Sequence, residues 1–158
     1  MRTLEEAYPS TAGKGRSGEE WMLKELQRHY PEVTDYTQDM TMQRRGIDFS
    51  IRRPDWSREF YLDVKNNLYI DKQKNETVFS IELGKANNKP GWFVTSQADR
   101  IYHVNTYLNR YMYYDLSQMR RWVIREISNG TLKIFMTADG SELIRIDSQT
   151  CPILAINM

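Results

Sequence analysis

The sequence has little of what disulfide-bonded, zinc-binding or membrane proteins need. It contains one cysteine, Cys151, and two histidines among 158 residues. These residues cannot form an internal disulfide or supply the four Cys or His ligands of a structural zinc site. No apolar run approaches the roughly 20 residues needed to cross a bilayer, and residues 1–16 include no apolar signal region. We therefore expect a cytoplasmic protein with no membrane contact.

The sequence also lacks an excess of positive or negative residues, because 22 Lys and Arg balance 21 Asp and Glu to leave a net charge of +1. Any basic surface for a polyanion must therefore be local. Hydrophobic residues make up 40% and charged residues 27%, as in folded domains. The length fits one domain. We predict a flexible leader over residues 1–16, where no hydrophobic period occurs, and a single domain over residues 17–158.

The first strong pattern predicts a helix over residues 17–30. Ser17 and Glu20 have the spacing of a capping box, and Pro31 ends the pattern. Glu19 lies on the apolar stripe of this helix, whereas Glu20 lies about a quarter-turn away, where capping or solvation would explain it. Both remain candidates for an acidic site residue, with Glu19 favoured. The stripe consists of Met22, Leu23, Leu26 and Tyr30.

Most of the remaining chain alternates between strand patterns and turns. Residues 47–51 and 59–64 are strand-like, and the turn residues 53–57 between them predict a β-hairpin. Together with the first helix, these segments predict an α/β (α+β) fold with a central mixed β-sheet flanked by helices. Further strands are predicted at 33–36, 78–82, 92–95, 101–104, 131–136 and 143–146, and a second helix at 117–128.

The hairpin gathers two acids and a lysine. If its turn is centred near Trp56, Asp48 pairs opposite Val64 and lies beside Asp63 and Lys65. Side chains alternate along a strand, so Asp63 and Lys65 project from the same face. The sequence thus predicts that two carboxylates and one ammonium group converge.

Two neighbouring acids repel and raise each other's pKa unless a cation lies between them. Mg²⁺ prefers carboxylate and carbonyl oxygens, so Asp48, Asp63 and the main-chain carbonyl of Val64 are the predicted metal ligands, with Glu19 completing the set. Mn²⁺ is expected to substitute. Lys65 would polarise or orient an attacking water. This chemistry predicts hydrolysis of a phosphodiester.

The order of these parts resembles the PD-(D/E)XK nuclease superfamily. An acid on the first helix, the segment 46–48 (Gly-Ile-Asp) and the segment 63–65 (Asp-Val-Lys) carry the resemblance, which covers about residues 17–66. It implies a restriction-endonuclease-like core, catalytic roles for the acids and Lys65, and usually DNA as the substrate. Residues 89–93, followed by Ala98-Asp99, loosely resemble later strands of phage-type relatives, which suggests a phage or bacterial host cell.

One departure from the family pattern concerns its proline-aspartate pair. The literal pair here is Pro54-Asp55, at the expected hairpin tip and far from Lys65. We therefore assign the metal-binding role to Asp48, although Ile47 replaces the usual proline.

Contacts to nucleic acid are expected from Arg44, Arg45 and Asn66, which flank the predicted acids along the chain. Cutting both strands usually calls for a symmetric pair of sites, so a homodimer is expected. Two alternatives remain open. One is a catalytically silent nucleic-acid-binding module of the same fold, and the other is a small α/β protein-interaction domain.

Overall fold

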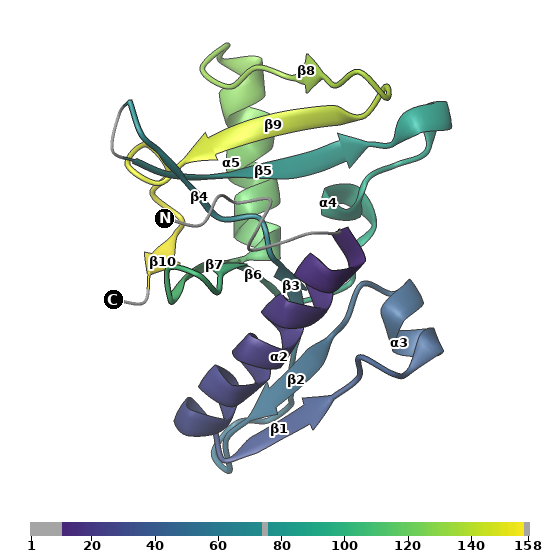
Figure 1. Cartoon of the computed structure of the whole chain (residues 1–158), viewed down its shortest axis with the longest axis vertical. Helices are drawn as coiled ribbons and strands as arrows, with labels where there is room; N and C mark the ends of the chain where they lie inside the picture. The colour runs from purple at the N-terminus through teal and green to yellow at the C-terminus, as the bar shows by residue number, and fades with distance from the viewer. Residues whose placement is uncertain (1–10, 74–75, 157–158) are drawn as a thin grey trace.

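A computed structural model describes residues 11–73 and 76–156 as a mixed α+β fold built on two β-sheets (Figure 1). The larger sheet has the strand order β1-β2-β3-β6-β7-β10. Its neighbours are antiparallel except β3 and β6, which are parallel, so the predicted central mixed sheet is confirmed. The strands are β1 (Glu32–Asp35), β2 (Phe49–Arg52), β3 (Phe60–Lys65), β6 (Arg100–Asn105), β7 (Arg110–Asp115) and β10 (Ala155–Ile156).

Helices and a second sheet cover the two faces of the larger sheet. On one face, helix α2 (Thr11–His29) buries Met22 and Leu26 against residues of β2, β3 and β6. On the other face, α5 (Leu116–Ser128) shares a core with the second sheet, which has the order β4-β5-β9-β8. This sheet consists of β4 (Tyr69–Asp71), β5 (Glu76–Gly84), β9 (Glu142–Asp147) and β8 (Phe135–Met136).

The first helix begins earlier than expected. Helix α2 starts at Thr11 rather than at Ser17, so it includes residues 11–16, which were expected to precede it. The two glycines of this segment weaken a helix by roughly 1 kcal/mol each without ending it. Residues 1–10 of the predicted leader lie outside the described residues.

The predicted hairpin is confirmed as β2 and β3, but its register differs by one residue. Phe49 pairs with Leu62, so continuing the ladder places Asp48 opposite Asp63 and not opposite Val64. Beyond Phe49 the ladder is irregular, because the Asp48 amide donates to the Leu62 carbonyl at 2.8 Å, one position out of this register. The carboxyl groups of Asp48 and Asp63 still meet, since they share a side-chain hydrogen bond.

Two short helices depart from the sequence-based expectations. The predicted strand at 92–95 is wrong, since these residues form helix α4 (Trp92–Thr95). The strand preference of these residues is outweighed by tertiary contacts. The Arg120 guanidinium donates to the carbonyls of Phe93, Val94 and Ser96. Helix α3 (Met40–Arg44), capped by Asp39, was not predicted at all.

Helix α5 and the β8–β9 hairpin agree better with the predictions made from the sequence. Asp115 caps α5 by accepting a hydrogen bond from the Gln118 amide at 2.8 Å, as the predicted helix at 117–128 requires. Strands β8 and β9 form the predicted last hairpin. Within residues 11–73 and 76–156, no helix is both long enough and apolar enough to cross a bilayer.

Candidate active site

Asp63 lies at the centre of a buried polar cluster on β3. It is only 2% exposed, and its Oδ1 lies 3.1 Å from the Lys65 Nζ. Its Oδ2 accepts a hydrogen bond from the Ser96 hydroxyl at 3.2 Å. Burial raises the pKa of Asp63 from 3.8 to about 7, opposed by the charge of Lys65 and reinforced by the charge and hydrogen bond of Asp48. The two acids therefore compete for one proton or one cation.

Asp48 is held rigidly beside Asp63. Its carboxylate is buried, and its Oδ2 accepts a hydrogen bond from the Val64 amide at 2.8 Å. Its Oδ1 accepts from the Gln43 side chain at 3.1 Å, and the same Gln43 amide donates to the Ile47 carbonyl at 2.9 Å. Gln43 comes from helix α3, so this unpredicted helix fixes one acid of the cluster.

The main chain at Val64 faces the same two acids. In a strand, the amide and the carbonyl of one residue point toward the same neighbour. The Val64 amide points to Asp48, so its carbonyl points to that side of β3 as well. Because β2 begins only at Phe49, the paired ladder ends before this carbonyl. This carbonyl therefore lies on the Asp48 side of β3.

Helix α2 adds Glu19 from the other side. The pKa of Glu19 is raised from 4.5 to about 7, chiefly by burial and also by the negative charges of Asp48, Asp35 and Asp63. Glu20, in contrast, is exposed. Glu19 is therefore close enough to the acids for their charge to affect it, whereas the side chain of Asp35, at the end of β1, is exposed and accepts hydrogen bonds from Thr37.

The close approach of α2 depends on Gly18. A Cβ added at Gly18 would lie 2.8 Å from the Cβ of Asn66 and 3.2 Å from a methyl group of Val104. Only glycine therefore lets this turn of the helix contact the end of β3. Asn66 follows Lys65 in the chain, so the contact places Glu19 and Asn66 at the same end of the sheet.

Lys65 is held among an acid, an indole ring and an imidazole. Its Nζ lies 5.0 Å from the centre of the Trp92 ring, in addition to its ion pair with Asp63. His103 is its register partner on β6 and is fully buried. Burial and the charge of Lys65 hold the pKa of His103 well below its ordinary value, so this imidazole is neutral. It bonds Tyr114 at 2.8 Å and stabilises the core under the lysine.

Arg44 and Arg45, the two arginines predicted to contact nucleic acid, come shortly before Asp48 in the chain. Arg44 is exposed on α3. Arg45 is half-buried, donates from Nε to the Gln97 side chain at 2.9 Å and lies over the Tyr61 ring. The literal Pro54-Asp55 pair lies in the exposed turn between β2 and β3, as expected for the hairpin tip.

The oxygen atoms at this site suit Mg²⁺ better than a metal ion that takes all of its ligands from the protein. Within the described parts of the chain, no group of three or more Asp, Glu, His or Cys side chains is arranged to hold a metal ion. Two carboxylates and one carbonyl remain, at Asp48, Asp63 and Val64. Mg²⁺ is commonly held by one or two carboxylates and keeps several of its waters, so this smaller set fits it.

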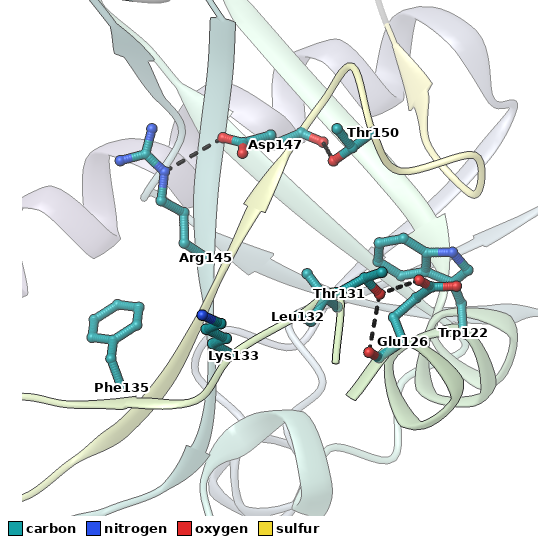
Figure 2. A pocket seen from close by; sticks show the side chains of 9 residues that line it. All are labelled: Trp122, Glu126, Thr131, Leu132, Lys133, Phe135, Arg145, Asp147 and Thr150. Atoms are coloured by element: carbon teal, nitrogen blue, oxygen red, sulfur yellow. Dashed lines mark hydrogen bonds and ion pairs between the residues drawn. The ribbon is translucent and has the colours of Figure 1, made fainter. Parts of the chain in front are cut away.

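A separate hollow lies between α5 and the second sheet, away from the acids. It has a volume of about 600 Å³, and Figure 2 shows the side chains that surround it. Among its charged groups, Arg145 pairs with Asp147 at 3.4 Å, and Glu126 accepts from Thr131. None of the acids of the cluster borders this hollow.

Comparison with known proteins does not assign this chain to a family. No protein-family model and no curated protein matches the sequence. Among solved structures, the chain is similar to D212, a nuclease from a fusselovirus, with 12% sequence identity and a TM-score of 0.46, over 94% of this chain and 86% of that chain. This likeness is too distant to indicate an activity, so only the residues of the chain itself can do so.

Proposed function

We propose that this protein is a Mg²⁺-dependent nuclease of the PD-(D/E)XK type that hydrolyses phosphodiester bonds in DNA. The observation that supports this most strongly is the buried contact between Asp48 and Asp63, with the Lys65 ammonium 3.1 Å from Asp63. A purely structural role is a poor explanation, since burying two like charges costs free energy that one ammonium only partly offsets.

The metal ligands in this proposal are the carboxylates of Asp48 and Asp63 and the carbonyl of Val64. Glu19, on α2, would contribute through a metal-bound water. When bound, Mg²⁺ lowers the pKa of a coordinated water and neutralises negative charge on the phosphate. Gln43 keeps Asp48 in position for this role.

Lys65 has a different task, because its ammonium is a donor and not a ligand. Asp63 and the Trp92 ring hold its Nζ at the edge of the cluster, where its side chain is 27% exposed. From this position it orients an attacking water and donates a hydrogen bond to charge that develops on a phosphate oxygen.

DNA is the proposed substrate and endonucleolytic cleavage the proposed mode, with Arg44, Arg45 and Asn66 contacting phosphates near the scissile bond. A homodimer would place two such sites on opposite strands. Cleavage of one strand requires only the single site described above.

The proposal is tested by incubating supercoiled plasmid with the purified protein in Mg²⁺, in Mn²⁺ and in EDTA. We expect nicked or linear plasmid with either ion and intact plasmid in EDTA, because the acids need the cation to act. Binding of DNA without cleavage in any ion would instead favour the silent module, and neither binding nor cleavage would favour the protein-interaction domain. Equal cleavage in EDTA would contradict the metal-dependent mechanism.

A further inference from the structure

Two exposed lysines lie on the loop that leads into α4. This loop, residues 85–91, includes the short helix η1 (Ala86–Asn88), and both Lys85 and Lys89 are exposed. Neither lysine, nor Arg44 on α3, takes part in an ion pair within residues 11–73 and 76–156. Figure 1 shows α3, α4 and η1 along the same side of the molecule.

The loop is fixed next to the candidate active site. The Gly91 amide donates to the Leu83 carbonyl at 2.8 Å, and a Cβ added at Gly91 would lie 2.3 Å from the Glu82 carbonyl oxygen. The following residue is Trp92, whose ring contacts the Lys65 ammonium. Lys89 is three positions before Trp92, so its Cα lies within about 10 Å of the Cα of Trp92. The loop therefore runs directly into the residue whose ring contacts the Lys65 ammonium.

The opposite end of α4 is tied to the arginines. The Gln97 amide donates to the Arg45 carbonyl at 2.8 Å, and the Arg45 Nε donates to the Gln97 side chain at 2.9 Å. Helix α4 thus has lysines before its first residue and the end of α3 beside its last. Positive groups adjoin the candidate active site from both directions along this helix.

We propose that Arg44, Arg45, Lys85 and Lys89 form a cationic rim that binds the phosphate backbone of duplex DNA on both sides of the scissile phosphate. This inference rests on the proposed nuclease function and extends it, since Lys85 and Lys89 are new contacts. Phosphates recur about every 3.4 Å along the axis of each strand. Lys89 therefore reaches a phosphate only a few nucleotides from the cleavage position.

The surroundings of the rim favour a duplex over a single strand. Proteins that bind single strands stack the bases on exposed aromatic rings. Among the described residues, the largely exposed aromatic side chains are Tyr107 and Phe135, and neither belongs to α3, α4 or the loop. Glu142 borders a hollow of about 300 Å³ next to Lys85 and Lys89, but it pairs with neither. Neither lysine therefore has an ion-pair partner among the described residues that would compete with a phosphate.

The test compares two double variants that remove the same charge. Lys85→Gln/Lys89→Gln alters the rim, and Lys72→Gln/Lys133→Gln alters exposed lysines on other parts of the surface. Binding to a blunt duplex and to its single strand is measured in EDTA over a series of salt concentrations, so that no cleavage intervenes. For the rim variant we expect roughly 10- to 100-fold weaker duplex binding near 0.1 M salt and a salt slope smaller by about 2. The control variant should bind like the wild type.

Each other result overturns a defined part of the account. If the wild type binds and cleaves duplex DNA but the rim variant keeps the same salt slope, the rim is wrong and the proposed nuclease function stands. If the wild type prefers the single strand, the duplex assignment is wrong. Absence of both binding and Mg²⁺-dependent cleavage in the wild type overturns the rim and the proposed function together. Thermal unfolding of both variants confirms that they fold, since all four side chains are exposed.

Discussion

Asp63→Asn is expected to abolish Mg²⁺-dependent cleavage, with initial rates on supercoiled plasmid lowered by roughly 10³-fold or more. The change keeps the shape of the side chain but replaces one carboxylate oxygen by an amide nitrogen. It thereby removes both the negative charge that faces Asp48 and the ion-pair partner of Lys65. The matched control is Asp55→Asn, in the exposed turn of the same hairpin, which should leave the rate unchanged.

The same variant should be more stable than the wild type without metal. Because the pKa of Asp63 is raised from 3.8 to about 7, the folded protein binds this proton more tightly than the unfolded chain does. Its contribution to stability is therefore greatest at acidic pH and is lost as the pH rises toward 7. Asparagine carries no charge, so at pH 8 in EDTA we expect a Tm higher by about 2–4 °C, corresponding to roughly 1 kcal/mol.

Thermal unfolding at pH 5 and pH 8 measures this effect directly. The difference between variant and wild type should shrink at pH 5, where Asp63 is protonated in the folded protein, and Mg²⁺ should raise the Tm of the wild type alone. A variant that is both inactive and less stable at pH 8 would mean that the Asp63–Lys65 pair holds the fold together. Loss of cleavage would then say nothing about catalysis.

Lys65→Met has the second largest expected effect, a loss of about 10²- to 10³-fold in cleavage rate. Methionine keeps an unbranched apolar side chain of nearly the same length, while the ammonium that lies over the Trp92 ring and orients water is lost. The metal ligands Asp48 and Asp63 remain, so Mn²⁺ binding should persist. The loss is measured as the plasmid cleavage rate at saturating Mg²⁺ beside Lys72→Met, which removes an exposed lysine. Unimpaired cleavage by Lys65→Met would remove this residue from the mechanism.

Local sequence signals predicted the hairpin that carries the acids. Alternating side chains and the turn at residues 53–57 identified β2 and β3, and their antiparallel pairing follows from the short connection. The register was wrong by one residue because the centre of the turn falls between Asp55 and Trp56 rather than at Trp56. In the structure the carboxyl groups of Asp48 and Asp63 share a hydrogen bond. The predicted pairing of Asp48 with Val64 would not have given this contact, because Val64 projects from the other face of the strand.

Contacts between distant segments could not be predicted in this way. Residues 92–95 have the composition of a strand, yet Arg120, far along the chain, satisfies the carbonyls of the helix that they form. The role of Trp92 at Lys65 was missed for the same reason. Gln43 offered only one weak signal, its position shortly before Asp48 in a polar segment, because its hydrogen bond depends on the unpredicted helix α3.

A Mn²⁺-soaked crystal, examined by anomalous scattering, tests most directly whether this carboxylate pair binds a divalent ion. We predict one ion within about 2.0–2.4 Å of carboxylate oxygens from both Asp48 and Asp63, and its loss in an Asp48→Asn crystal soaked in the same way. An ion bound elsewhere with these two acids left vacant, or full occupancy in Asp48→Asn, would contradict the metal site and the nuclease mechanism built on it.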